Sequence, residues 1–114
     1  MTRVSFFFRQ GEITGFTAGG HSGYADSGYD IVCAAISALT QTCELGLGEV
    51  AGIAVNVKRD DDAGKYEVRL PDKVDEASML KAQTIFETLL IGLKSIESSY
   101  PEFLRVNANE RRWN

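Results

Sequence analysis

The chain has 114 residues, of which 44% are hydrophobic and 25% are charged, and its formal net charge is −4. This length predicts one globular domain over 1–114, and the acidic balance without a basic patch argues against direct binding of nucleic acid. Residues 1–9 lack a signal-peptide pattern and no uninterrupted apolar run reaches the roughly 18 residues that cross a bilayer, so we expect a cytoplasmic protein without a membrane partner.

Two strands joined by a tight turn are predicted at the start of the chain. Residues 2–9 and 12–18 both alternate between apolar and polar side chains, which is the period of a strand with one buried face. The pair at 10–11 suits a two-residue hairpin turn. This alternation places Phe7 and Phe16 on the face of the sheet that points away from the core.

A loop over 19–28 is expected next, because its glycines, serines and aspartate support no regular element. Loops of this length are often functional. A helix over about 30–45 would follow the loop. Asp30 is a suitable N-cap for it, and the glycines at 46 and 48 are suitable terminators.

The two cysteines of this helix are predicted to have different surroundings. At 100° per residue, Cys43 falls on a broad apolar arc that would face the core. Cys33 falls on the opposite side of the helix, together with Ser37 and Thr40. In a cytoplasmic protein both cysteines are expected to be free thiols.

The second half of the chain repeats the pattern of two strands and a helix. Strands are predicted at about 50–58 and 65–70, joined by an acidic turn at 60–64, with a helix at about 73–98 and a last strand at 102–108. The order ββαββαβ predicts an α+β two-layer sandwich, in which a mainly antiparallel sheet carries both helices on one face.

The only histidine lies in the expected loop, and one of the two cysteines lies in the first turn of the helix that follows it. With Asp30 as N-cap, Cys33 falls at about the third helical position, where free N–H groups and the helix dipole favour a thiolate, the nucleophilic form. His21 is within reach as a base that takes the thiol proton. Asp30 could orient the imidazole or cap the helix, and the sequence leaves these two roles open.

Metal and phosphate sites are disfavoured. One histidine and two cysteines on different faces of a helix do not supply a closed tetrahedral zinc site. The loop matches neither of the common glycine motifs that bind phosphate. We therefore expect no metal and no cofactor. Placement alone also leaves open that Cys33 is a structural residue.

One segment resembles a known family. Gly20-His21, followed by GYDIVCAA at 28–35 and by Ser37, is similar to the signature of the ribosomal-processing cysteine protease Prp family. The resemblance implies that His21 and Cys33 are the catalytic pair and that Asp30 supports them. It also implies a substrate loop that includes Gly20, Gly23, Gly28 and Ser37.

The resemblance further implies a homodimeric bacterial endopeptidase. Its substrate would be the N-terminal extension of a large-subunit ribosomal protein, number twenty-seven, which is removed during ribosome assembly. The chain departs from the family pattern at 22–24, where Ser-Gly-Tyr follows the histidine. Two rival functions remain: a non-enzymatic, ribosome-associated peptide-binding module, and a thiol redox protein. The redox function is weakened by the lack of a C-x-x-C motif and by the core position of Cys43.

Overall fold

The structure is a computed structural model that describes residues 1–20 and 27–109. Its elements, in chain order, are β1 (Thr2–Arg9), β2 (Glu12–Gly19), α1 (Ser27–Glu49), β3 (Asn56–Asp60), β4 (Lys65–Arg69), α2 (Glu76–Ser99) and β5 (Leu104–Asn107). The predicted order ββαββαβ is confirmed.

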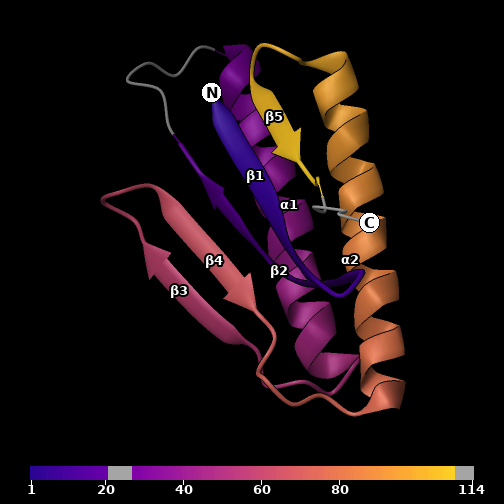
Figure 1. Cartoon of the computed structure of the whole chain (residues 1–114). Helices are drawn as coiled ribbons and strands as arrows, with labels where there is room; N and C mark the ends of the chain where they lie inside the picture. Colours follow the sequence, from indigo (N-terminus) through magenta and orange to yellow (C-terminus); the bar gives the residue numbers. More distant parts are fainter. Residues whose placement is uncertain (21–26, 110–114) are drawn as a thin grey trace.

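The strands form one sheet in the order β3-β4-β2-β1-β5. All neighbouring strands are antiparallel except β1 and β5, which are parallel. Both helices lie on the same side of this sheet (Figure 1). The predicted two-layer α+β sandwich with a mainly antiparallel sheet is therefore confirmed.

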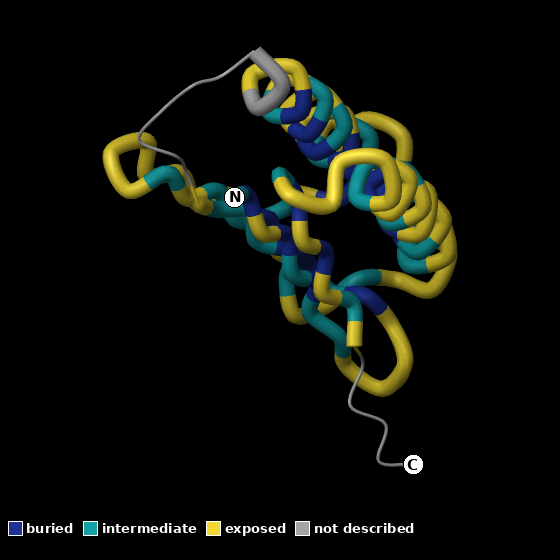
Figure 2. The backbone as a smooth tube through the Cα atoms, turned by 90° about the horizontal axis from the view of Figure 1, so that it is seen from above, coloured by how far each residue is buried: buried dark blue, intermediate teal, exposed yellow. Residues whose placement is uncertain are grey.

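The core lies between the sheet and the two helices. Its fully buried large side chains come from strands and helices alike, and they include Val4, Phe16, Val32, Leu47, Val68, Phe86, Leu93 and Leu104. Exposed residues follow the outer sides of the helices and the hairpin tips (Figure 2). The predicted turn between β1 and β2 is also present, with positive φ at Gln10 and Gly11, as expected for a two-residue hairpin turn.

The prediction for Phe16 is wrong, because a β-bulge changes the alternation within β2. Phe7 pairs with Gly15 but Phe8 pairs with Ile13, so one residue of β2 has no partner in β1. A one-residue slip moves every following side chain to the other face. Phe16 is therefore fully buried, while Phe7 stays on the outer face as predicted.

Helix α2 compensates for the disruption at this bulge. The Gln83 side chain accepts a hydrogen bond from the Ile13 backbone N–H at 2.7 Å and donates one to the Ile13 carbonyl at 2.8 Å. Leu70 N–H donates to the Thr14 carbonyl at 2.9 Å. The backbone polar groups beside the extra residue therefore have partners within the protein.

Helix α1 is longer at both ends than the sequence predicted. It begins at Ser27, so Asp30 lies inside the first turn and is not the N-cap. Gly46 and Gly48 lie within the helix, which ends before Gly52, where a φ of 71° reverses the chain. A Cβ at Gly46 would lie 3.7 Å from Ile85 of α2, which is an ordinary van der Waals distance. Burial of Leu47 between the two glycines outweighs their weak helix propensity.

The buried side of α1 also differs from the predicted arc. Cys43 is buried as expected, but so is Thr40, whose hydroxyl donates to the Ile36 carbonyl at 2.9 Å within the same helix. Residues 30–49 are long and apolar enough, by length and composition, to cross a membrane. Core helices of globular proteins meet the same criterion, and α1 places Val32 and Leu47 in the core.

Among the later elements, β4 and α2 match their predictions closely, whereas β3 does not. β4 follows its predicted range, and α2 begins after Asp75, whose carboxylate accepts a hydrogen bond from Ser78 N–H at 2.8 Å. β3 is shorter than predicted, because the segment before it is irregular. Ile53 in that segment is buried, whereas Val57 in the strand is 37% exposed and not on a buried face.

Candidate active site

Cys33 opens onto a groove between α1 and the β2–β4 part of the sheet. The groove has a volume of about 180 Å³, and its lining comes from β1, β2, α1, β3 and the β3–β4 turn as well as β4. Cys33, Ser37 and Thr40 line it from the helix, at positions that are one turn apart. The side of the helix that the sequence singled out as distinct from the apolar arc therefore faces this groove.

The Cys33 thiol contacts a hydroxyl group of β1. Thr2 Oγ1 lies 4.0 Å from Cys33 Sγ, and either atom can be the donor. Cys33 is half-buried, whereas the Thr2 side chain is buried. The thiol is therefore held between the sheet and solvent, where a substrate in the groove can reach it.

The N-terminal end of β1 also contacts Gly20, the residue before the sole histidine. Gly20 has a φ of 96°, and a Cβ at this position would collide with the Met1 carbonyl oxygen. Only glycine fits both the backbone conformation and the space. The groove wall next to β1 thus requires glycine at position 20.

A small charged and aromatic cluster links the opposite wall of the groove to α1. Tyr66 OH donates a hydrogen bond to the Glu44 carboxylate, and Arg59 pairs with the same carboxylate oxygen at 3.4 Å. The Arg59 guanidinium lies 4.2 Å from the centre of the Tyr66 ring. Burial, followed by the hydrogen bond to Glu44, raises the pKa of Tyr66, so this phenol stays neutral at ordinary pH.

The two cysteines are in different environments, as predicted. Cys43 is 4% exposed, and burial, with a smaller effect of the Glu44 charge, raises the pKa of its thiol to about 12. It therefore stays protonated at neutral pH and is unsuited to nucleophilic attack.

The predicted helix-terminus environment of Cys33 needs a correction. Because α1 begins at Ser27, Cys33 lies in the second turn and not at the third position. The free N–H groups belong to the first turn, and the effect of the helix dipole falls off within that turn. Asp30 lies inside the first turn, so it does not act as the N-cap.

The other predicted site residues divide into two groups. His21 and Gly23 lie outside the described residues. Gly28 and Ser37 belong to α1 and not to a loop, and Gly20 directly follows β2. The structure thus places Gly20 and Ser37 in the groove beside Cys33.

Sequence reasoning missed Thr2 as a neighbour of the thiol, Arg59 and Tyr66 as lining of the groove, and Glu44 as their partner on α1. Thr2 could have been noticed in the sequence, because it is a polar residue on the inward face of β1, which it shares with Val4 and Phe6. A polar side chain at a buried strand position needs a partner, and such partners are often functional. The other three come together only through the pairing of β3 with β4 and their approach to α1.

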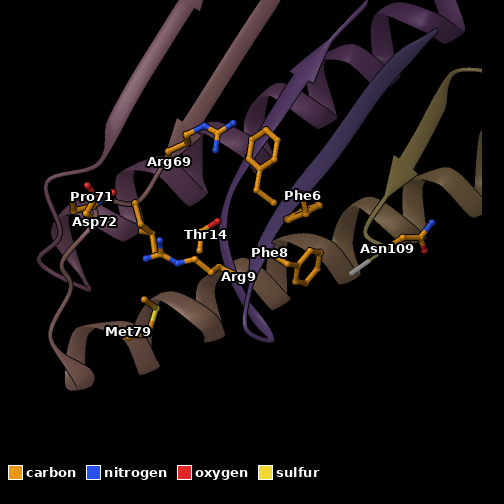
Figure 3. Close-up of a pocket in the computed structure, with 11 residues that line it drawn as sticks. Phe6, Phe8, Arg9, Thr14, Arg69, Pro71, Asp72, Met79 and Asn109 are labelled. Atoms are coloured by element: carbon orange, nitrogen blue, oxygen red, sulfur yellow. The ribbon is translucent and has the colours of Figure 1, made fainter. Parts of the chain in front are cut away.

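A larger concavity of about 550 Å³ lies at the other end of the sheet (Figure 3). It lies beside the β1–β2 turn and the start of α2, and its lining includes Phe8, Arg9 and Met79. It contains no cysteine, and Arg69 above it stacks on the Phe7 ring at 3.8 Å. Its chemistry does not match that of a nucleophilic site, so the smaller groove is the candidate active site.

A half-buried thiol that opens onto a groove in an α+β sandwich is an arrangement suited to a cysteine-dependent hydrolase. The model of the family described as cysteine protease Prp matches residues 1–105. The chain belongs to this family of cysteine proteases.

Relatives of the chain agree in sequence and in structure. It is 30% identical to the ribosomal processing cysteine protease Prp of Bacillus subtilis over 97 residues, which is 85% of this chain and 87% of that protein. A Streptococcus mutans crystal structure matches with 30% identity and a TM-score of 0.84, covering 95% of this chain and 93% of that one. The Staphylococcus aureus Prp protease in complex with a substrate peptide matches with 27% identity and a TM-score of 0.82, covering 96% and 100%.

Proposed function

We propose that the protein is a cytoplasmic endopeptidase that removes the N-terminal extension of large-subunit ribosomal protein number twenty-seven during ribosome assembly. The observation that carries this proposal is the half-buried Cys33 thiol in a groove that strands and a helix build together. The names of the relatives as ribosomal processing proteases support the substrate class.

In the proposed mechanism His21 takes the proton from Cys33, and the thiolate attacks the scissile carbonyl carbon. Collapse of the tetrahedral intermediate breaks the C–N bond, and the protonated His21 gives its proton to the leaving amine. Water then attacks the thioester and releases the acid product, which regenerates the thiol. Hydrogen-bond donors in the groove that stabilise negative charge on sulfur or on the carbonyl oxygen would lower the activation free energy of the attack.

Two solved relatives support a peptide substrate and a covalent route. One Staphylococcus aureus Prp structure contains a substrate peptide, and another contains a covalently linked product peptide. A covalent link to a product is what nucleophilic catalysis forms. The second match has 28% identity to this chain and a TM-score of 0.79, covering 96% of this chain and 100% of that one.

The protein is further proposed to act as a homodimer. Large apolar side chains are exposed on both helices, among them Ile31, Leu45, Leu80 and Ile91. Exposed large apolar side chains on two packed helices support association with a second copy. Sedimentation at several protein concentrations would test it, and a monomer at all of them would contradict it.

The test of the function compares the two thiols on one helix. A peptide that spans the cleavage site of the ribosomal protein is incubated with the wild-type chain, Cys33→Ala and Cys43→Ala. We expect Cys33→Ala to lose cleavage and Cys43→Ala to retain it, because only Cys33 reaches the groove. Cleavage by Cys33→Ala would overturn the assignment of the nucleophile.

The same experiment separates the enzyme from the rival peptide-binding module. Binding is followed by fluorescence anisotropy of a labelled peptide alongside cleavage. A protein that binds the peptide without ever cleaving it, with equal affinity in wild type and Cys33→Ala, would favour the binding module. A protein that neither binds nor cleaves this peptide would exclude the proposed substrate.

A further inference from the structure

We propose that Thr2 is a positioning residue for the nucleophile, whose hydroxyl donates a hydrogen bond to Cys33 Sγ when the sulfur is a thiolate. This inference rests on the proposed role of Cys33. The observed start of α1 motivates it, because the free N–H groups of the helix lie a turn away from this thiol. A hydroxyl close to the sulfur can supply a hydrogen bond that these N–H groups do not.

Loss of the thiol proton determines which side chain donates the hydrogen bond between Thr2 and Cys33. Thr2 Oγ1 and Cys33 Sγ are 4.0 Å apart, and both residues line the groove. A thiolate has no proton to give, so the hydroxyl is then the donor. Hydrogen bonds to charged acceptors are shorter and stronger than neutral ones, so the contact tightens as the nucleophile forms.

The backbone of Thr2 is fixed by the sheet, which makes it a suitable anchor. Thr2 N–H donates to the Phe103 carbonyl at 3.0 Å, and Thr2 is in register with Leu104 of β5. Sites built on regular elements are held more tightly than those built on loops. Because Met1 contacts Gly20, the same strand end touches both segments that lead to the proposed catalytic pair.

Thr40 provides a matched control within the same groove. Thr2 and Thr40 are the two buried polar residues of the described chain, 8% and 2% exposed. The Thr40 hydroxyl donates to the carbonyls of Ile36 and Ser37 in its own helix, at 2.9 and 3.3 Å. Removing it deletes a buried hydroxyl from the groove without a contact to the thiol.

The experiment measures the rate of Cys33 alkylation by iodoacetamide from pH 5 to 10, resolved by mass spectrometry of the modified peptides. The full chain is compared with Thr2→Val, Thr2→Ala, Thr2→Ser and Thr40→Val. We expect Thr2→Val and Thr2→Ala to move the midpoint of the profile to higher pH and to slow alkylation about tenfold at neutral pH, because a hydrogen bond to a charge contributes about that factor. Thr2→Ser should restore the wild-type midpoint, and Thr40→Val should keep it.

Either of two results would overturn the inference. One is an unchanged midpoint in both variants without the Thr2 hydroxyl, and the other is an equal shift in Thr2→Ser. In peptide cleavage, a positioning role predicts that Thr2→Val lowers kcat with little change in KM. The alkylation assay needs no peptide, so a negative result there leaves the proposed protease function intact, whereas a shifted midpoint without peptide cleavage would refute the proposed substrate and not the hydrogen bond.

Discussion

Cys33 and Cys43 lie on the same helix and have opposite chemical character. Cys33 is half-buried and lines the groove, whereas Cys43 is buried and has a thiol pKa raised to about 12. Ten residues of helix separate them by about 15 Å. The identity of a side chain therefore does not decide its reactivity here. What decides it is whether the sheet covers that turn of α1 or leaves room for a groove.

The largest expected effect is the difference in reactivity between the two thiols. At pH 8 a thiol with a pKa of about 12 is ionised in roughly one molecule in 10⁴. We therefore expect iodoacetamide to modify Cys33 at least about 10³-fold faster than Cys43 in the native protein. Similar modification rates for Cys33 and Cys43, measured by mass spectrometry before any unfolding, would show that the two thiols do not differ in reactivity. Both cysteines should react at similar rates in urea.

A second contrast compares two other positions on α1. Leu47 is fully buried near Cys43, so Leu47→Ala should lower the free energy of unfolding by about 3 kcal/mol. Ser37 lines the groove and is exposed, so Ser37→Ala should change it by less than about 0.5 kcal/mol. Urea denaturation measures both values. Similar losses at the two positions would mean that the groove end of the helix is as tightly packed as the core.

A third contrast concerns pH, and its sign follows from the raised pKa of Cys43. The folded protein keeps this thiol protonated up to about pH 12, whereas the unfolded chain loses the proton near the ordinary value of 9.0. The resulting stability is fully present below pH 9 and falls by about 1.4 kcal/mol per pH unit between those two values. The raised pKa of Tyr66 acts in the same alkaline direction.

Cys43→Ala is the variant that isolates this effect. It should flatten the loss of stability above pH 9, whereas Cys33→Ala should leave the slope as in the wild type. Urea denaturation at pH 8 and pH 10 is sufficient to measure the difference. An equal slope in the wild type and Cys43→Ala would show that other groups dominate alkaline unfolding.

The sequence was sufficient for the order and type of every element, because hydrophobic alternation and helical periodicity are local properties. It failed where tertiary contacts overrode local preference. Phe16 was misplaced because the bulge in β2 depends on pairing with β1 and on Gln83 of α2. The glycine at 46 did not end α1, because burial of Leu47 in the core favours the longer helix.

The candidate site was predictable only in part. The choice of Cys33 over Cys43 followed from the helical wheel, since a 100° rotation per residue separates their faces. Thr2, Arg59 and Tyr66, which line the same groove as Cys33, come from three different strands, and their position depends on strand order and register. No local pattern encodes that order. The resemblance to the Prp family, and not periodicity, supplied the reaction and the substrate.

The parallel pairing of β1 with β5 has a consequence for how the protein is made. Thr2 is aligned with Leu104, and these residues are separated by nearly the whole described chain. During synthesis, β1 emerges from the ribosome long before β5, so the strand end beside Cys33 lacks its partner until β5 is available. The surroundings of the thiol are therefore completed only after residues 104–107 have been made. A nascent chain stalled before β5 should have a Cys33 environment unlike that of the finished protein.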